Sequence, residues 1–132
     1  MFCSIGILRI EPKSKSTPLK PWWAILECCP DLGRYYLEQA KRAFWWHSGL
    51  QKPAWGPHVS FIRGEEPPAG LDSWRAMGDI EVPFLYTGKI KSDGKHFWTT
   101  VFCQPAEDIR EKLGLPRQPE FPLHLTFAVA HG

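Results

Sequence analysis

The sequence lacks the patterns that mark metal-binding, secreted and membrane-spanning proteins. Its four cysteines form no Cys-x-x-Cys pair, and no Cys/His spacing resembles a zinc site. The apolar run at the N-terminus is too short for a signal peptide, and no stretch approaches the roughly 20 apolar residues of a membrane helix. We therefore expect a cytoplasmic protein with reduced thiols, no membrane partner, no metal and no other cofactor.

The chain also lacks an excess of one charge and a cluster of carboxylates. It has 16 Lys and Arg residues against 14 Asp and Glu residues, which gives a formal net charge of +2. Proteins that coat long nucleic acids need a basic surface, so this balance favours a small anionic ligand in a local pocket. The closest carboxylate pair, Glu65 and Glu66, lies in a Pro/Gly-rich loop where the two side chains cannot converge on one ion.

What the sequence does contain is enough apolar surface for a folded domain. Its 132 residues are 43% hydrophobic and 23% charged, which is typical of one globular domain over residues 1–132. Seven Trp and eight Phe residues are many for this length. Most should fill the core, and any that line a cleft would suit flat ligands such as nucleobases.

Hydrophobic patterning predicts six strands and two helices. The strand-like runs cover residues 2–10, 22–29, 58–63, 81–91, 96–103 and 123–130. One amphipathic helix is predicted from an N-cap at Asp31 to about Ser48, and a second over 105–113 with Gly114 as its stop. The chain thus repeats the order strand, strand, helix, strand. Hairpin-type connections favour an α+β fold of antiparallel sheets with helices packed outside.

Each repeat ends on a strand that carries a His-x-Ser/Thr motif. Residues i and i+2 of a strand project on the same face, so His58 shares a face with Ser60, and His124 shares a face with Thr126. Continued alternation adds Ile62, Ala128 and Ala130 to the motif faces. The opposite, apolar faces are Val59 and Phe61 in the first strand, and Leu125, Phe127 and Val129 in the second.

These four side chains suit the cleavage of a phosphodiester without a metal. One imidazole can take the proton from the attacking oxygen while the other delivers a proton to the leaving oxygen, because histidine titrates near neutral pH. The hydroxyls of Ser60 and Thr126 can donate to the non-bridging oxygens. Each motif alone occurs often by chance, and two satisfied polar pairs on an exposed sheet face are the competing interpretation. The matched pair favours a catalytic role for His58 and His124.

Several aromatic and basic residues are candidates for binding the substrate. We favour Trp23 and Trp98 as stacking partners for bases, with Tyr86 and Trp74 as further options. Strict alternation points Arg63 away from His58, which predicts a structural ion pair rather than contact with phosphate. On the hairpin, Lys95 and His96 could reach a phosphate or be solvated.

The motifs His58-Val59-Ser60-Phe61 and His124-Leu125-Thr126-Phe127 in a duplicated chain resemble the two-histidine (2H) phosphoesterase superfamily. This resemblance implies a bilobal fold of two pseudo-symmetric antiparallel sheets that form a central cleft, with the helices packed outside. It implies that His58, Ser60, His124 and Thr126 are the catalytic positions. It leaves open which histidine acts as acid and which as base.

The residues around the first motif carry a narrower resemblance. The sequence KPAWGP before His58, and Arg63-Gly64-Glu65 after it, are similar to small 2H proteins of tailed phages that degrade cyclic oligonucleotide messengers and so defeat host CBASS immunity. The implied substrate is a cyclic di- or trinucleotide, opened at a 3′-5′ linkage. Members of that group also use residues beyond the second motif; we expect that segment to be absent here or its role to fall to other residues.

Three other functions fit parts of this pattern. The first is an RNA 2′,3′-cyclic phosphodiesterase of the LigT type, against which the balanced charge argues mildly because long RNA favours a basic groove. The second is a non-catalytic nucleotide-binding module, and the third is an interaction protein with chance motifs. The sequence does not indicate base preference, linkage preference or oligomeric state.

Overall fold

A computed structural model describes residues 1–11, 21–47 and 49–130. The mixed Lys, Ser and Pro residues of 13–21 predict a polar loop, and this segment lies almost wholly outside these ranges, as does Ser48 at the predicted end of the first helix. None of the helices in the described ranges is both long enough and apolar enough to cross a lipid bilayer.

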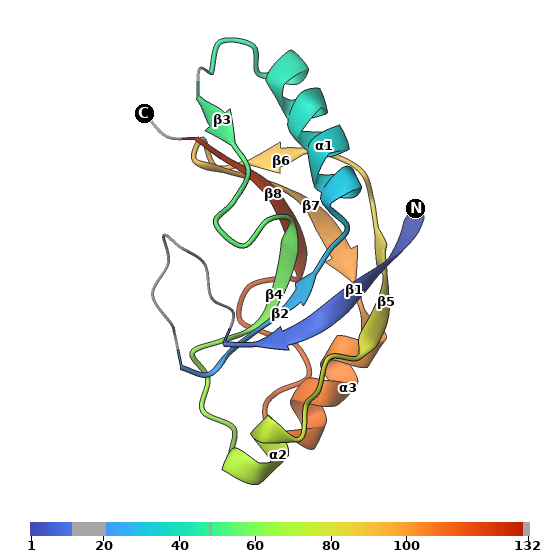
Figure 1. Cartoon of the computed structure of the whole chain (residues 1–132), viewed down its shortest axis with the longest axis vertical. Coiled ribbons are helices and arrows are strands. Elements are labelled where there is room, and N and C mark those ends of the chain that lie inside the picture. The colour runs from blue at the N-terminus through green and yellow to red at the C-terminus, as the bar shows by residue number, and fades with distance from the viewer. Residues whose placement is uncertain (12–20, 48, 131–132) are drawn as a thin grey trace.

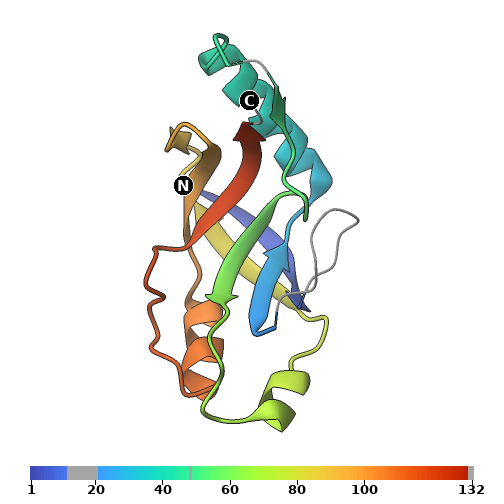
Figure 2. The same cartoon turned by 90° about the vertical axis from the view of Figure 1, so that its left-hand side faces the viewer.

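Six strands form a closed antiparallel barrel. They are β1 (Phe2–Ile10), β2 (Trp23–Glu27), β4 (His58–Arg63), β5 (Glu81–Tyr86), β7 (His96–Phe102) and β8 (His124–Ala130). Around the barrel the order is β8, β4, β2, β1, β5, β7, and a pairing of β7 with β8 closes it. Figure 2 shows β8, β4 and β2 side by side on one side of the molecule, with β1 and β5 behind them.

The closed barrel differs from the two sheets that we expected. Each half of the chain does form three adjacent strands, β4-β2-β1 and β5-β7-β8. These two sets join at both edges, because β1 pairs with β5 and β4 pairs with β8. The two edge pairings convert two sheets into a single one, so that the motif strands lie next to each other rather than facing across a gap.

The predicted repeat of strand, strand, helix, strand is confirmed in both halves. Helix α1 (Pro30–Ala43) precedes the first motif strand and packs against β8, while α3 (Gln104–Lys112) precedes the second and packs against β5 (Figure 1). The strand predicted over 81–91 is divided into β5, which ends at Tyr86, and the short strand β6 (Lys91–Ser92). Two further short elements were not predicted: β3 (Leu50–Gln51) and α2 (Leu71–Arg75), which have two and five residues, too few to show a period.

The residues at which the two long helices begin and end correct two predictions and confirm one. The N-cap of α1 is Cys29 rather than Asp31, because Pro30 already occupies the first helical turn, where its missing N–H costs nothing. Asp31 instead pairs with Arg34 one turn later. The helix ends at Ala43, before the predicted Ser48. Gly114 ends α3 with a φ of 85°, a left-handed conformation that glycine adopts without steric cost.

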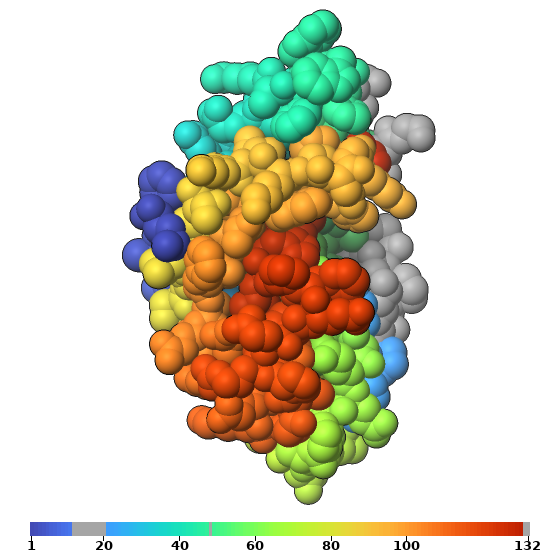
Figure 3. Space-filling model, turned by 180° about the vertical axis from the view of Figure 1, so that it is seen from behind, coloured from blue at the N-terminus to red at the C-terminus, as the bar shows by residue number. Residues whose placement is uncertain are grey.

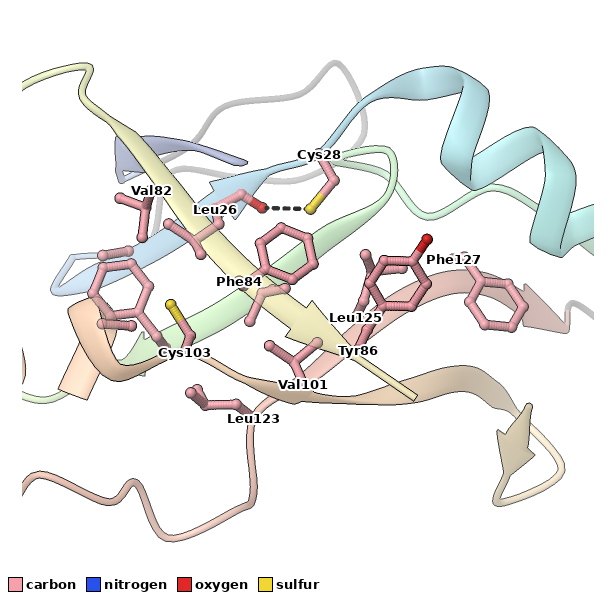
Figure 4. Close-up of a cluster of buried hydrophobic side chains, with 14 of the residues drawn as sticks. Leu26, Cys28, Val82, Phe84, Tyr86, Val101, Cys103, Leu123, Leu125 and Phe127 are labelled. Carbon is pink, nitrogen blue, oxygen red and sulfur yellow. Dashed lines mark hydrogen bonds between the residues drawn. The ribbon is translucent and has the colours of Figure 1, made fainter. Parts of the chain in front are cut away.

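Side chains from all six strands fill the barrel. Figure 4 shows Leu26, Phe84, Val101 and Leu125 meeting between the strands that carry them. The same buried cluster includes Val59, as alternation predicts. Because these inward positions are apolar, the polar positions of the motif strands are left on the outer face of the barrel, where a cavity forms.

Candidate active site

The two motifs lie on neighbouring, directly paired strands. In the antiparallel pairing of β4 with β8, His58 lies opposite Thr126 and Val59 lies opposite Leu125. Directly opposite residues project on the same face of a sheet, about 4.5–5.5 Å apart at their Cβ atoms. The histidine of the first motif is therefore next to the hydroxyl of the second, and the same register places Ser60 next to His124.

A β-bulge follows the first motif. Ser60 pairs with Ile25 of β2. The next pair is Ala24 with Ile62, so Phe61 is an extra residue of β4 without a partner in β2. Such an extra residue kinks the strand and changes the direction of the side chains that follow.

The second motif is followed by a β-bulge at the corresponding residue. Thr126 pairs with Trp98 of β7. The next pair is Phe97 with Ala128, so Phe127 is the extra residue of β8. The duplication therefore extends beyond the order of elements to the register of the site strands.

The bulges reverse the alternation that the sequence analysis assumed. After them, Ile62 and Ala128 point into the buried core, whereas Arg63 and Val129 line the cavity on the outer face. The prediction that Ile62, Ala128 and Ala130 share the motif face is therefore wrong, as is the core position of Val129. The reason is that each bulge adds one residue to the pleat, which shifts every later side chain to the opposite face.

A cavity of about 640 Å³ lies over the motif strands. This volume is within the range of pockets that hold small organic ligands. All six predicted site residues line it, and β2, β4, β7 and β8 together with three loops supply the walls. The lining residues with polar or aromatic side chains are Trp23, Trp55, His58, Ser60, Arg63, Asp93, His96, Trp98, Thr100, Phe121, His124 and Thr126.

Both imidazoles are oriented in the same way. The Nδ1 atom of His58 lies 2.7 Å from the carbonyl oxygen of Gly56, and Nδ1 of His124 lies 2.8 Å from that of Pro122. In each case the carbonyl belongs to the residue two positions earlier. A carbonyl only accepts, so Nδ1 carries the proton in each ring, and Nε2 of the neutral ring keeps its lone pair.

The surroundings of the two rings favour their neutral forms. Burial lowers the pKa of His58 to about 4, with smaller contributions from His124 and Arg63, and it outweighs the hydrogen bond to Gly56. Burial also lowers the pKa of His124, and the electrostatic influence of Arg63 and of His96 acts in the same direction. Both rings are therefore neutral in the free protein at neutral pH, and each has the Nε2 lone pair that can accept a proton.

The two residues that carry hydroxyls are as buried as His58 and more buried than His124, which is half-buried. Ser60 and Thr126 retain only 8% and 9% of their exposure and line the cavity. Since each lies across the strand pair from the histidine of the other motif, the four groups form two mixed pairs rather than two separate motifs. Their O–H groups can donate to an anion held over the strands.

Aromatic side chains form the walls of the cavity. The ring centroids of Trp23 and Trp55 lie 5.7 Å apart, and those of Trp98 and His124 are also separated by 5.7 Å. Both predicted stacking residues thus line the cavity, and their role in binding stays a prediction. Trp55 and Phe121 were missed, although a visible signal exists: each is an aromatic residue three positions before a motif histidine.

Two other aromatic candidates are excluded from the site. Tyr86 and Trp74 are buried in the core, with 7% and 1% of their surface exposed. Trp74 packs edge-on against Trp22, and Tyr86 packs against Tyr36. Their neighbours are apolar because both side chains point inward from their elements.

Arg63 corrects a prediction, because it lines the cavity instead of forming a structural ion pair. Its Nη2 atom lies 3.1 Å from Nε2 of His124, and its guanidinium stacks over Phe121 at 5.6 Å. Glu65 pairs with Arg110 instead. The bulge at Phe61 causes the difference, since strict alternation would place Arg63 on the opposite face.

On the hairpin, His96 also lines the cavity. Its Nδ1 atom lies 3.4 Å from Asp93, whose carboxylate also accepts the backbone N–H groups of Lys95 and His96. These hydrogen bonds lower the pKa of Asp93 to about 2. Within the described ranges, no group of three or more His, Cys, Asp and Glu side chains could hold a metal ion.

The matched halves, the paired imidazoles and the aromatic walls are thus features of this chain's own geometry. Comparison of the chain with protein-family models, with curated proteins and with solved structures found no match.

Proposed function

We propose that the protein is a metal-independent phosphodiesterase in which His58 and His124 are the general base and general acid. The observation that carries this proposal is that two imidazoles, each with Nδ1 held by a backbone carbonyl, line one cavity beside two buried hydroxyls. A structural histidine needs no second histidine in the same arrangement. Two oriented bases are what a displacement at phosphorus needs at its two ends.

The proposed reaction starts with the 2′-hydroxyl of a ribose. Its O–H proton passes to Nε2 of one histidine as the oxygen forms a bond to phosphorus. The bond from phosphorus to the 5′-oxygen breaks, and the other histidine, protonated beforehand, gives its proton to that oxygen. The product end is a 2′,3′-cyclic phosphate, which water can open with the roles of His58 and His124 exchanged.

The hydroxyls stabilise the charge of this transition state. Ser60 and Thr126 lie beside the two imidazoles and can donate to the non-bridging oxygens. Because both are largely removed from water, these hydrogen bonds are stronger than the same contacts in solution.

We propose cyclic di- or trinucleotide messengers as the substrates, with cleavage at a 3′-5′ linkage. The size of the cavity, its aromatic walls and the balanced net charge support a compact anionic ligand with bases over a long nucleic acid. The resemblance to phage proteins that oppose CBASS immunity supports the same substrates and a counter-defence role. The matching order of elements in the two halves supports a 2H phosphoesterase fold with these halves as its lobes.

The proposal is tested by incubating the purified protein, with EDTA present, with cyclic dinucleotides, cyclic trinucleotides, 2′,3′-cyclic mononucleotides and linear RNA. We expect ring opening of a cyclic oligonucleotide, seen by chromatography as a linear product. Cleavage of the 2′,3′-cyclic mononucleotides alone would indicate the LigT-type reaction. Tight binding without cleavage of any substrate would show a binding module.

Substitution of the site residues gives a second test. His58→Ala and His124→Ala should each lower kcat by about 10²–10⁴-fold, since each removes one proton transfer. Ser60→Ala and Thr126→Ala should cost about 10- to 100-fold, the value of one hydrogen bond to a charged group. His47→Ala is the matched control, because His47 lies outside the cavity against Phe97. Full activity of His124→Ala would contradict the paired mechanism.

A further inference from the structure

Arg63 is a half-buried cation that lines the cavity, and its burial costs hydration free energy. Burial lowers the pKa of its guanidinium, which means that the charged form loses hydration there. Its Nη2 atom lies 3.1 Å from Nε2 of the neutral His124 ring, and its guanidinium stacks over Phe121. The charge of Glu65 offsets part of the lost hydration, but that carboxylate pairs with Arg110. Among the described residues, no carboxylate lies in salt-bridge contact with the Arg63 guanidinium, and an anion bound in the cavity would supply that compensation.

Arg63 cannot keep its contact with His124 when that ring carries a proton. Protonated Nε2 is a donor, so the contact between Arg63 and His124 changes from a hydrogen bond to a repulsion between two donors and two positive charges. An anion between them removes this conflict, because its oxygens accept from both. The pair is therefore arranged for a bound phosphate that lies between Arg63 and protonated His124.

The ion pair of buried Arg110 with partly exposed Glu65 holds the backbone on both sides of Ile62. Arg110, with only 1% of its surface exposed, donates from Nη1 to the carbonyl oxygen of Phe61 at 2.7 Å. It also donates from Nη1 and Nη2 to the two carboxylate oxygens of Glu65, both at 2.8 Å. Glu65 in turn accepts the backbone N–H of Arg63 at 3.2 Å.

These hydrogen bonds fall on the bulge itself. Phe61 is the extra residue of the bulge, and Arg63 is the first residue after it that faces the cavity. Arg110 comes from α3 in the other half of the chain, and its Nε donates to Pro116 at 2.7 Å. Figure 3 shows the segment of α3 and the loop after it, in orange and red, lying against the green segment that follows β4.

We propose that Arg63 binds the phosphate of the substrate, and that the Arg110–Glu65 pair positions Arg63 by fixing the bulge. This inference deepens the proposed function and rests on it for the identity of the ligand. The two roles differ: Arg63 contacts the phosphate, whereas Arg110 and Glu65 act through the backbone. The equivalent residue of the second half is Val129, so at this position of the strand only the first half supplies a cation.

The binding role is tested with inorganic phosphate as the probe, followed by the NMR signals of the histidine Cε1–H protons. Phosphate should shift the His124 signal of the wild-type protein. Arg63→Gln should weaken phosphate binding at least about tenfold, and Arg63→Lys by less, because lysine keeps the charge and loses the two-pronged geometry. Arg75→Gln, an exposed arginine of α2, is the control. Unchanged phosphate affinity in Arg63→Gln would overturn the proposal.

The same spectra report on His124 without any catalysis. Arg63 lowers the pKa of His124, so Arg63→Gln should raise that pKa in the absence of phosphate, while the influence of His96 persists. An unchanged pKa of His124 in Arg63→Gln would contradict the contact on which the inference depends.

The positioning role is tested by combining substitutions. Glu65→Gln keeps an acceptor oxygen for Arg110 and should weaken phosphate binding by about threefold or more. If Glu65 acts through Arg63, the double variant Arg63→Gln/Glu65→Gln should bind no more weakly than Arg63→Gln alone. Additive losses would show that Glu65 acts independently and would overturn the positioning role. Arg110→Lys provides a second variant with the same expectation.

Measurement of kcat and KM distinguishes an error in this inference from an error in the proposed function. In an active protein, Arg63→Gln should raise KM or lower kcat at least about tenfold for every cleaved substrate. Wild-type kcat and KM in Arg63→Gln would overturn the inference alone. An inactive wild-type protein that binds phosphate through Arg63 would overturn the proposed function and leave the phosphate site in place.

Discussion

At the scale of single residues, the same hydrogen bond from a histidine to a backbone carbonyl occurs in both motifs. Each histidine donates its Nδ1 proton to the carbonyl two residues earlier, His58 to Gly56 and His124 to Pro122. This local bond selects the tautomer and the ring orientation without a carboxylate. Because the carbonyls orient the two rings, the site needs no Asp or Glu beside the motifs for this purpose.

The first prediction at this scale concerns the pH dependence of activity. The mechanism needs one neutral and one protonated imidazole, and the pKa values of both rings in the free protein are lowered, that of His58 to about 4. The singly protonated pair is therefore lost as pH rises above the lowered pKa of His124. We expect kcat/KM to fall by about tenfold per pH unit on the alkaline side, with an optimum below neutrality. A profile that rises with pH would contradict this assignment.

The second prediction concerns stability. The pKa of His58 is lowered from 6.5 to about 4 on folding, so between these values the unfolded chain binds more protons. Stability should therefore rise with pH across this window, by up to about 3 kcal/mol. Urea denaturation at several pH values measures this change. His58→Gln should reduce the slope; His47→Gln is the control, and an equal slope in His58→Gln would refute the prediction.

At the scale of elements, the two bulges and the first turn of α1 set the position of the motif strands. Gly33 of α1 packs directly on Pro57, the residue before His58, and a Cβ atom at Gly33 would lie 2.7–3.0 Å from the proline ring. Pro57 cannot move aside freely, because its carbonyl accepts the N–H of Cys28 at 3.0 Å. The helix is thereby fixed against the start of the first motif strand.

Gly33→Ala should therefore destabilise the protein, although alanine is the better helix former. The gain in helix propensity is about 1 kcal/mol. Overpacking against a fixed neighbour costs about 1–3 kcal/mol, so the net effect should be a loss of stability. Urea denaturation measures it. Glu38→Ala on the exposed side of α1 is the control, and a more stable Gly33→Ala variant would show that α1 and Pro57 can separate.

At the scale of the whole molecule, neither half can complete the core or the cavity by itself. Half of the barrel would leave two open strand edges, β1 and β4 in one half and β5 and β8 in the other. The buried cluster takes residues from both halves, and so does the cavity. The site therefore forms only when both halves have folded together into the closed barrel.

We therefore expect one cooperative unfolding transition in the intact chain and none in the separated halves, residues 1–79 and 80–132. A three-stranded sheet without its covering partner buries too little apolar surface for independent stability. Coincident transitions in tryptophan fluorescence and far-UV circular dichroism test the first statement. Cooperative unfolding of either fragment alone would contradict the second.

The local features of this protein could be predicted from its amino-acid pattern. Alternation and turn residues predict the six barrel strands, both long helices and the repeated order, and they place each motif histidine beside a hydroxyl on one face. These features depend on residues within a few positions of each other, which is why a pattern can reveal them. The same reasoning identified Trp23 and Trp98 as residues of a shared site.

The way in which these strands and helices pair could be seen only in the folded chain. The pairing of β4 with β8 joins strands far apart in the sequence, and it makes one barrel where we expected two sheets. The bulges at Phe61 and Phe127 arise from pairing with β2 and β7, so alternation along one strand could not foresee that Arg63 turns into the cavity. Register and bulges are set by the partner strand, and that partner is known only when the chain has folded.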